Sequence, residues 1–363
     1  MTLEEEIKAV EDEISRTKYN KATEGHIGRL KAKVAHLKEL VQKRASSKSA
    51  GEGFAVRKSG DASVVLVGFP SVGKSTLLNC LTNAESQVAA YEFTTLDVVP
   101  GTMKYKGATI QILDVPGLVK GAASGRGRGR EVISIVRNAD MAVILLDVFQ
   151  IDHYDVLLQE LNDAGIRINS RPPDVTIRKR PRGGITISST VGLELEEDTI
   201  KSIFNEYRLH NADVVIRQPL NIDQLIDAIL GNRKYMPALV AINKIDLADE
   251  YLLKKCREKF PDALLVSADR NINIEELKKA LFENLGFIRI YLKPQGKPAD
   301  MDEPLIVREG STIGNICDRL HRDFRNRFRY AQVWGLSAKH EGQRAGIEHV
   351  LYDNDILTIV LRK

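Results

Sequence analysis

The sequence contains little cysteine and no long apolar run. Cys80, Cys256 and Cys317 are the three cysteines among 363 residues, and they lie far apart inside predicted helices. This spacing favours small buried side chains over a metal or redox site. The seven histidines are equally scattered, and we find no nucleophile triad. No apolar segment approaches membrane-spanning length, and the acidic start MTLEEEIKAVEDEI is unlike a secretory signal. We therefore expect a cytoplasmic protein without membrane contact.

Charge is nearly balanced overall, at a formal net value of +4, but it is uneven near the start of the chain. Residues 4–13 carry six acids and one lysine, whereas residues 16–48 carry ten Lys or Arg and two acids. Apolar residues recur at helical spacing on both sides of GHIG, which predicts a basic helical hairpin, broken at GHIG, and a linker over 1–60. The basic helix is either a solvated face or an RNA contact through Lys31, Lys33 and Lys38.

The most informative segment is GFPSVGKST, which follows the apolar run 64–67. Its glycines, lysine and serine fit the G-x-x-x-x-G-K-[ST] loop, whose backbone amides surround phosphates at a helix N-terminus. We expect the lysine to reach the outer phosphates and the serine hydroxyl to bind Mg²⁺. The nucleotide-binding residues predicted here are Gly68, Phe69, Pro70, Ser71, Val72, Gly73, Lys74, Ser75 and Thr76.

Two later segments indicate which base is bound. In AINKIDL, an apolar run ends at Asn243, Lys244 and Asp246. A carboxylate at Asp246 can accept hydrogen bonds from guanine N1–H and the exocyclic amine, whereas adenine lacks this donor pair. A site built on such bonds can reject an analogue lacking them by roughly 10⁴ to 10⁵ fold. In ALLVSAD, the backbone amides of Ser267 and Ala268 are predicted to approach the guanine oxygen.

Two further segments predict nucleotide-sensitive switches. IQILDVPGL places Asp114 at a strand end, where it would hold Mg²⁺ through water, and Gly117 beside the γ-phosphate. In YEFTTL, Phe93, Thr94 and Thr95 would lie at the nucleotide, and we favour Thr95 as the Mg²⁺ ligand that lets go after hydrolysis. The expected metal ligands are Ser75, Thr95 and Asp114, and the groups expected to assist catalysis are Lys74, Thr95 and Gly117. No side chain is identified as the general base.

Leu118 stands where many switch GTPases have a glutamine that orients the attacking water. Leucine cannot do this, so we expect slow hydrolysis unless a monovalent cation, a partner or an internal arginine assists. The glycine- and arginine-rich segment 117–131 is expected to become ordered only against nucleotide or a partner.

The fold class expected is α/β, a doubly wound and mostly parallel sheet, because each motif closes an apolar strand. This GTPase domain is split into 61–150 and 236–287. Residues 151–235 are too many for one connecting helix and predict an inserted α+β module, with a hairpin around the turn PRGG. The hairpin is rich in arginine and is either a second RNA contact or a solvated strand edge. Residues 288–363 predict a ubiquitin-like β-grasp domain.

The chain resembles the developmentally regulated GTP-binding (DRG) proteins of the Obg-related GTPases over its whole length. GFPSVGKSTLLN, YEFTTL, DVPGLVKGAASGRGRGRE, the stretch 233–246 and IRIYLKPQGKPAD carry this resemblance. It implies a GTPase linked to translation and ribosomes, K⁺-stimulated hydrolysis, a DRG-family regulatory partner and a C-terminal TGS domain with RNA or ribosomal contacts. Cation-dependent relatives commonly have asparagine at the position of Ser71, whose hydroxyl is a poorer ligand.

Three functions compete. The first is a regulatory GTPase that cycles between GTP and GDP and associates with ribosomes or RNA. The second is a nucleotide-gated scaffold for RNA or the ribosome whose hydrolysis is incidental. A metabolic enzyme such as a nucleoside kinase gives no reason for Asp246 or for two switches. A monomer is expected, although the sequence does not decide the oligomeric state.

Overall fold

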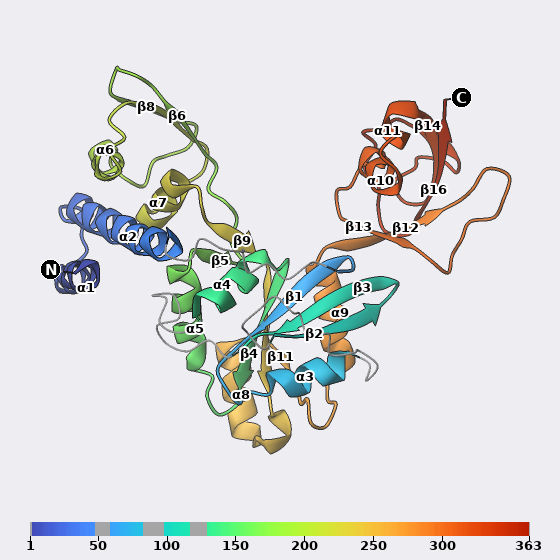
Figure 1. Cartoon of the computed structure of the whole chain (residues 1–363), viewed down its shortest axis with the longest axis horizontal. Helices are drawn as coiled ribbons and strands as arrows, with labels where there is room; N and C mark the ends of the chain where they lie inside the picture. The colour runs from blue at the N-terminus through green and yellow to red at the C-terminus, as the bar shows by residue number, and fades with distance from the viewer. Residues whose placement is uncertain (1, 48–58, 83–97, 117–128, 363) are drawn as a thin grey trace. The chain divides into compact units, whose positions relative to one another are not determined.

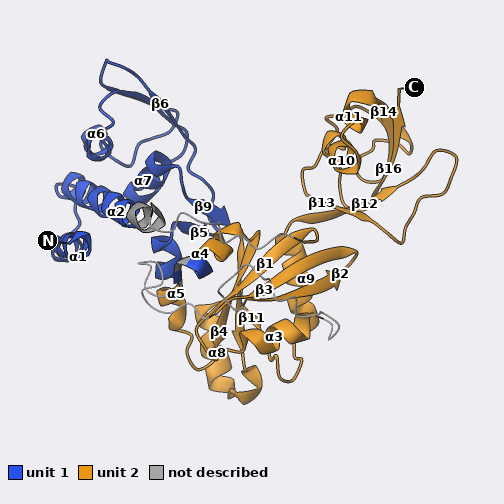
Figure 2. Ribbon diagram, viewed as in Figure 1, with its two compact units in different colours: residues 1–53, 120–133, 158–236 blue, residues 54–119, 134–157, 237–363 orange. Residues whose placement is uncertain are grey.

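The computed structural model describes residues 2–47, 59–82, 98–116 and 129–362 (Figure 1). It divides into two compact units (Figure 2). Unit 1 comprises residues 1–53, 120–133 and 158–236, and unit 2 comprises residues 54–119, 134–157 and 237–363. Among the described helices, none has both the length and the apolar character that crossing a membrane requires.

A six-stranded sheet forms the centre of unit 2, in the order β11-β10-β4-β1-β3-β2. Every neighbouring pair is parallel except β2 and β3. The strands are β1 (Ala62–Val67), β2 (Val99–Tyr105), β3 (Ala108–Asp114), β4 (Met141–Asp147), β10 (Ala238–Asn243) and β11 (Leu264–Leu265). All six residues of β1 are buried, as expected for a strand of a parallel sheet that is covered on both faces. The doubly wound α/β fold class is confirmed.

Helices connect these strands and supply the rest of the core. They are α3 (Lys74–Leu81), α4 (Gly129–Asn138), α5 (His153–Asp163), α8 (Glu250–Lys259), α9 (Ile274–Asn284) and the short 3₁₀ helix η1 (Ile245–Leu247). Leu77 of α3 and Leu277 of α9 are fully buried in one apolar cluster with Leu66 of β1. This packing fixes the strand ends that carry the motifs.

The start of α9 has no side-chain cap from the residue at its N-cap position. Asn273 lies at the N-cap position but has a left-handed backbone with φ of 57° and makes no side-chain cap. Its amide donates instead to the carbonyl oxygen of Leu265, 2.7 Å away. The side chain therefore joins the helix start to β11.

The helical hairpin of unit 1 is confirmed, but its break lies earlier than GHIG. The helices are α1 (Leu3–Arg16) and α2 (Glu24–Ser47). The chain turns between them, where Asn20 and Thr23 exchange side-chain-to-backbone hydrogen bonds of 3.0 and 2.9 Å. Gly28 lies within α2, and a Cβ there would be 3.2 Å from Ile203. These glycines allow α2 to pack closely on α6 (Glu197–Glu206) and do not end the helix.

The inserted segment contains the predicted strands, but they do not form a hairpin. β6 (Val175–Lys179) and β7 (Ile185–Ser189) both pair with β8 (Ala212–Ile216), which lies between them. β8 takes the centre because its Ala212, Val214 and Ile216 are buried in the apolar cluster of unit 1. The unit also contains α7 (Ile222–Leu230) and a parallel pair formed by β5 (Ile166–Ile168) and β9 (Lys234–Met236).

The C-terminal part of unit 2 is a five-stranded sheet in the order β13-β12-β16-β14-β15. Its elements are β12 (Phe287–Leu292), β13 (Leu305–Arg308), α10 (Ile313–Leu320), α11 (Phe324–Arg327), β14 (Phe328–Trp334), β15 (Gln343–Ala345) and β16 (Asp355–Leu361). β12 and β13 pair as an antiparallel hairpin.

Candidate functional site

The predicted phosphate-binding segment lies between β1 and α3, and its backbone conformation depends on two glycines. Gly73 has φ of 92°, and a Cβ there would lie 2.4 Å from Nδ2 of Asn243. A Cβ on Gly68 would lie 2.6 Å from the carbonyl oxygen of Leu145. Any larger residue would displace the loop or its neighbours, which explains the glycines of the motif in steric terms.

Lys74 begins α3 and folds back over the loop. Its side chain is buried, and its Nζ donates to the carbonyl oxygens of Phe69 at 3.0 Å and Gly68 at 3.3 Å. Burial lowers the pKa of Lys74, and the negative charge of Asp114 partly opposes this shift. An ammonium held among carbonyl groups at the loop is suited to exchange these acceptors for phosphate oxygens.

Ser75 and Asp114 meet beside the loop. The Ser75 hydroxyl donates to Oδ2 of Asp114 at 2.5 Å, although the two residues come from α3 and the end of β3. Hydroxyl and carboxylate oxygens are ligands that Mg²⁺ prefers, so this pair fits the predicted metal site. The remaining predictions on this side, Phe93, Thr94, Thr95, Gly117 and Leu118, lie outside the described residues.

Asn243 joins the phosphate loop to the predicted guanine-reading segment. This residue is buried at the end of β10, and its Nδ2 donates to the carbonyl oxygen of Val72 at 2.9 Å. Its Oδ1 accepts a 3.0 Å hydrogen bond from the backbone amide of Ala268. One side chain therefore holds three motifs that are far apart in the sequence.

Asp246 is oriented by Ser267. The buried Ser267 hydroxyl donates to Oδ1 of Asp246 at 2.5 Å, and the Arg270 amide donates to the same hydroxyl oxygen at 3.2 Å. Asp246 itself is exposed. The backbone amide of Ser267 donates to the carbonyl oxygen of Ile272. Because the Ser267 and Ala268 amides have acceptors within the protein, their approach to guanine stays a prediction.

Asp147 was not predicted as a site residue, but it lies beside Asn243 in the β4–β10 register. Its Oδ2 accepts a 2.7 Å hydrogen bond from Nζ of Lys244, which also donates to the carbonyl oxygen of Ser71 at 2.9 Å. Lys244 thereby ties two strand ends to the phosphate loop. The sequence did contain a pattern that could have identified Asp147, because this aspartate ends the apolar run MAVILLD in the same way that Asp114 ends its own apolar run.

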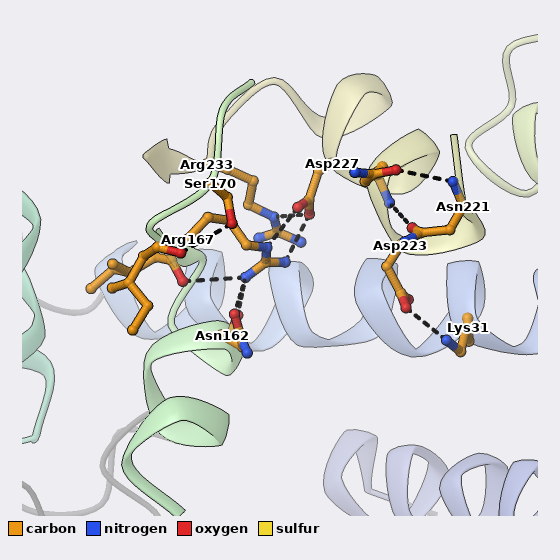
Figure 3. Close-up of polar contacts among 11 residues, drawn as sticks. Lys31, Asn162, Arg167, Ser170, Asn221, Asp223, Asp227 and Arg233 are labelled. Atoms are coloured by element: carbon orange, nitrogen blue, oxygen red, sulfur yellow. Dashed lines mark hydrogen bonds and ion pairs between the residues drawn. The ribbon is translucent and has the colours of Figure 1, made fainter. Parts of the chain in front are cut away.

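The three lysines proposed for RNA contact all face carboxylates within unit 1. Lys31 pairs with Asp223 at 2.7 Å and Lys33 with Glu6 at 2.8 Å, while Lys38 lies 2.9 Å from both Glu11 and Asp163. The Lys31 pair is visible in Figure 3. RNA would have to replace existing carboxylate partners, so this part of the RNA hypothesis loses support.

A more buried charge network lies in the same unit. The guanidinium of Arg167 makes two hydrogen bonds of 2.6 and 2.8 Å to the carboxylate of Asp227, and Arg233 adds a third at 2.7 Å (Figure 3). The Asp227 side chain is 6% exposed. Arg167 also donates to the carbonyl oxygen of Asn162 at the end of α5. This network links β5 and α7 to Arg233, the residue directly before β9.

Comparison with known families gives three matches along the chain. The family described as a 50S ribosome-binding GTPase matches residues 63–179. A second family, described as the C-terminal region of that domain, matches residues 182–287. The TGS domain family matches residues 288–361. The predicted TGS resemblance is thereby confirmed.

Curated relatives match along almost the full chain. An uncharacterized GTP-binding protein of Methanocaldococcus jannaschii is 57% identical and covers 100% of this chain and 94% of its own length. A developmentally regulated G-protein of Arabidopsis thaliana is 47% identical, over 99% of each chain. The developmentally regulated GTP-binding protein 1 homolog of Dictyostelium discoideum is 45% identical, over 99% of this chain and 100% of its own. The chain therefore belongs to the developmentally regulated GTP-binding protein family of P-loop GTPases.

Proposed function

We propose that this chain is a regulatory switch that binds GTP, hydrolyses it to GDP and phosphate, and acts in association with ribosomes. The observation that carries this proposal is the linked geometry of Asn243, Asp246 and Ser267. A buried amide connects this group to the phosphate loop, and a hydrogen bond from a buried hydroxyl orients the exposed carboxylate. We propose that this carboxylate accepts hydrogen bonds from both guanine donors, which the base of ATP lacks.

The residues proposed to contact the phosphates lie at neighbouring strand ends of the same sheet. The amides of residues 68–75 surround the phosphates, and Lys74 leaves its loop carbonyls to contact the outer ones. Ser75, Thr95 and Asp114, the last through water, would hold Mg²⁺, and the bound ion would neutralise phosphate charge. Water attacks the γ-phosphate in line, and loss of that phosphate frees Thr95 and Gly117, so both switches relax.

Hydrolysis by the isolated chain is slow, because Leu118 cannot orient water. K⁺, a ribosome or a regulatory partner raises the rate. Ser71 has φ of 65° at an exposed position of the loop, and its carbonyl already accepts the Lys244 ammonium. A weak K⁺ effect alongside a strong ribosome effect is therefore the expected pattern.

The ribosome is proposed as partner because the family that matches residues 63–179 is described as ribosome-binding. The alternative is a nucleotide-gated scaffold, which the absence of a glutamine at Leu118 favours. Steady-state GTP hydrolysis in K⁺ and in Na⁺, each with and without ribosomes, separates the two. Turnover that stays low in all four conditions, with tight GTP binding, would support the scaffold.

Asp246→Asn tests the base assignment directly. We expect GTP affinity to fall by on the order of 10³-fold or more, since the amide no longer matches both guanine donors. Affinity for xanthosine triphosphate should rise, because a carboxamide N–H can donate to the oxygen that replaces the exocyclic amine. Glu250→Gln, an exposed nearby change in α8, is the matched control. Unchanged GTP affinity in Asp246→Asn would refute the assignment.

A further inference from the structure

Unit 1 contains a cavity of about 520 Å³, separate from the candidate nucleotide site. Residues of α1, α2, α5, α7 and β5 line it, together with Arg233 directly before β9. Part of the lining is apolar and comes from three helices, through Ile14, Val34, Ala35 and Ile226. Among the described residues, four basic and five acidic side chains supply most of the remainder. A cavity of this volume can hold a small molecule.

One group of lining residues carries an excess of positive charge. The carboxylate of Asp227, which is 6% exposed, is shared by the guanidinium groups of Arg167 and Arg233 (Figure 3). We call these three residues the arginine cluster. Arg167 uses its Nε and both terminal nitrogens on Asp227 and on the carbonyl oxygen of Asn162.

Arg233 keeps donors that the cluster does not use. Its Nε donates to Asp227, but within the described part of the chain its two terminal nitrogens make no hydrogen bond. These nitrogens are also not among the fully buried atoms that lack a partner, so a ligand can reach them. Two parallel N–H groups of a guanidinium match the two oxygens of a carboxylate in both charge and geometry.

A second group of lining residues carries an excess of negative charge. Nζ of Lys38 lies 2.9 Å from a carboxylate oxygen of Glu11 and 2.9 Å from one of Asp163. One positive charge therefore faces two negative charges, and we call these three residues the carboxylate cluster. An ionised carboxylate offers about four acceptor positions, so both acids can accept from a second ammonium as well.

The two clusters are neighbours within the cavity. Arg167 of the arginine cluster donates to the carbonyl oxygen of Asn162 at 2.7 Å, and the next residue of α5 is Asp163 of the carboxylate cluster. The remaining pair of Lys31 and Asp223 is neutral as a whole. With five acids and four bases, the lining has a formal charge of −1, which disfavours ligands of high negative charge such as nucleotides.

We propose that this cavity binds a free α-amino acid with an apolar side chain. Its carboxylate accepts from the terminal nitrogens of Arg233, and its ammonium donates to Glu11 and Asp163. Both charged groups of an α-amino acid are attached to one carbon, which suits two clusters joined by consecutive residues. The side chain of the ligand packs on the apolar part of the lining. A monocarboxylate or an amine alone satisfies only one cluster.

Calorimetric titration of the full-length protein with leucine tests this proposal. Isocaproate lacks the ammonium and isoamylamine lacks the carboxylate, so each should bind at least about tenfold more weakly than leucine. Glycine should also bind at least about tenfold more weakly, because it leaves the apolar lining uncovered. Inorganic phosphate should not compete with leucine.

Two variants remove different parts of the site. Arg233→Gln loses the terminal guanidinium nitrogens, while Arg167 keeps its two bonds to Asp227, and leucine affinity should fall at least about tenfold. Ala35→Met fills part of the apolar lining without changing a charge and should lower leucine affinity at least about fivefold. This second variant keeps the test decisive if Arg233→Gln fails to fold. Ala22→Met, at a separate hollow of the same unit, is the matched control and should leave leucine affinity unchanged.

Three results would overturn the proposal. The first is no saturable binding of leucine at millimolar concentrations. The second is equal affinity for leucine and isocaproate, which would make the cavity a site for simple carboxylates. The third is unchanged leucine affinity in either folded variant, which would place leucine elsewhere. GTP affinity measured on the same samples keeps the two proposals apart, since a failure of leucine binding leaves guanine recognition intact.

Discussion

Lys38 on α2 and Lys293 after β12 are both partly buried lysines in basic stretches of sequence, but they face different neighbours. Lys38 lies between the carboxylates of Glu11 and Asp163, whereas Lys293 lies over the ring of Trp334. The first arrangement uses positive charge to hold elements of unit 1 together, and the second leaves the charge available to an anion. A count of lysines and arginines along the sequence does not distinguish these cases, because the neutralising acids are 27 and 125 residues away from Lys38.

The strongest test of internal pairing is Asp227→Ala. Removal of this buried carboxylate leaves the partly buried Arg167 and Arg233 without their counter-charge, which costs up to about 3–5 kcal/mol. We expect the denaturation midpoint of unit 1 to fall and hydrogen exchange of α7 to accelerate. Asp223→Ala, at the exposed Lys31 pair, should cost less than about 1 kcal/mol. If Asp227→Ala costs no more than Asp223→Ala, then the buried network does not stabilise the unit.

A smaller loss of stability is expected when Lys38 is replaced. Burial by itself lowers the pKa of the Lys38 ammonium, but the hydrogen bonds to Glu11 and Asp163 outweigh this, and its pKa is raised. Lys38→Gln should therefore lower the free energy of unfolding by about 1–2 kcal/mol, since two carboxylates lose a partly buried partner. Lys33→Gln, at a pair with a more exposed lysine, should cost less. If the two variants lose the same free energy of unfolding, then the position of Lys38 between two carboxylates adds no stability.

Several residues of the candidate nucleotide site could be located from the sequence because they lie within contiguous motifs that end apolar strands. Asp114 and Asn243 end β3 and β10, as the apolar runs predicted. Lys74 and Ser75 begin α3 after the loop that follows β1, and Asp246 lies in η1 after β10. Asp147 was missed because its role depends on Lys244, which reaches it across 97 residues of sequence.

The two fold predictions that were wrong failed for a similar reason. Alternating residues around PRGG indicated a hairpin, yet β8 separates its two strands. Local turn chemistry cannot reveal that a later and more buried strand competes for the same edge. GHIG was interpreted as a break, but its glycines allow α2 to approach α6, and that contact is invisible in the local sequence.

The salt dependence of RNA affinity also tests whether the lysines of α2 are paired internally. This test does not rely on a large change in stability. The double variant Lys31→Gln with Lys33→Gln should leave the slope of log RNA affinity against log salt unchanged, because both lysines are already paired with acids. Each released phosphate contact would otherwise lower the slope by about 0.7. Fluorescence anisotropy of a labelled single-stranded RNA at several salt concentrations measures it. A slope reduced by about 1.4 in the double variant would place α2 in the RNA interface after all.

The smallest expected effect concerns Arg289, four residues before Lys293 in sequence, which pairs with Asp353 at 2.6 Å. Burial alone would raise the pKa of Asp353, but hydrogen bonds from Arg289 outweigh it and lower the pKa below its usual 3.8. A lowered folded-state pKa adds stability that is present above 3.8 and is lost as the pH falls through the folded value. Because the Asp353 side chain is 38% exposed, solvent screening limits this contribution to less than about 1 kcal/mol. Asp353→Asn should therefore differ from the wild type in unfolding free energy at pH 6, and the two should converge as the pH falls through the lowered pKa of Asp353 in the folded state. Urea titrations at several pH values measure this difference, and equal unfolding free energies at pH 6 would show that the ion pair adds no stability.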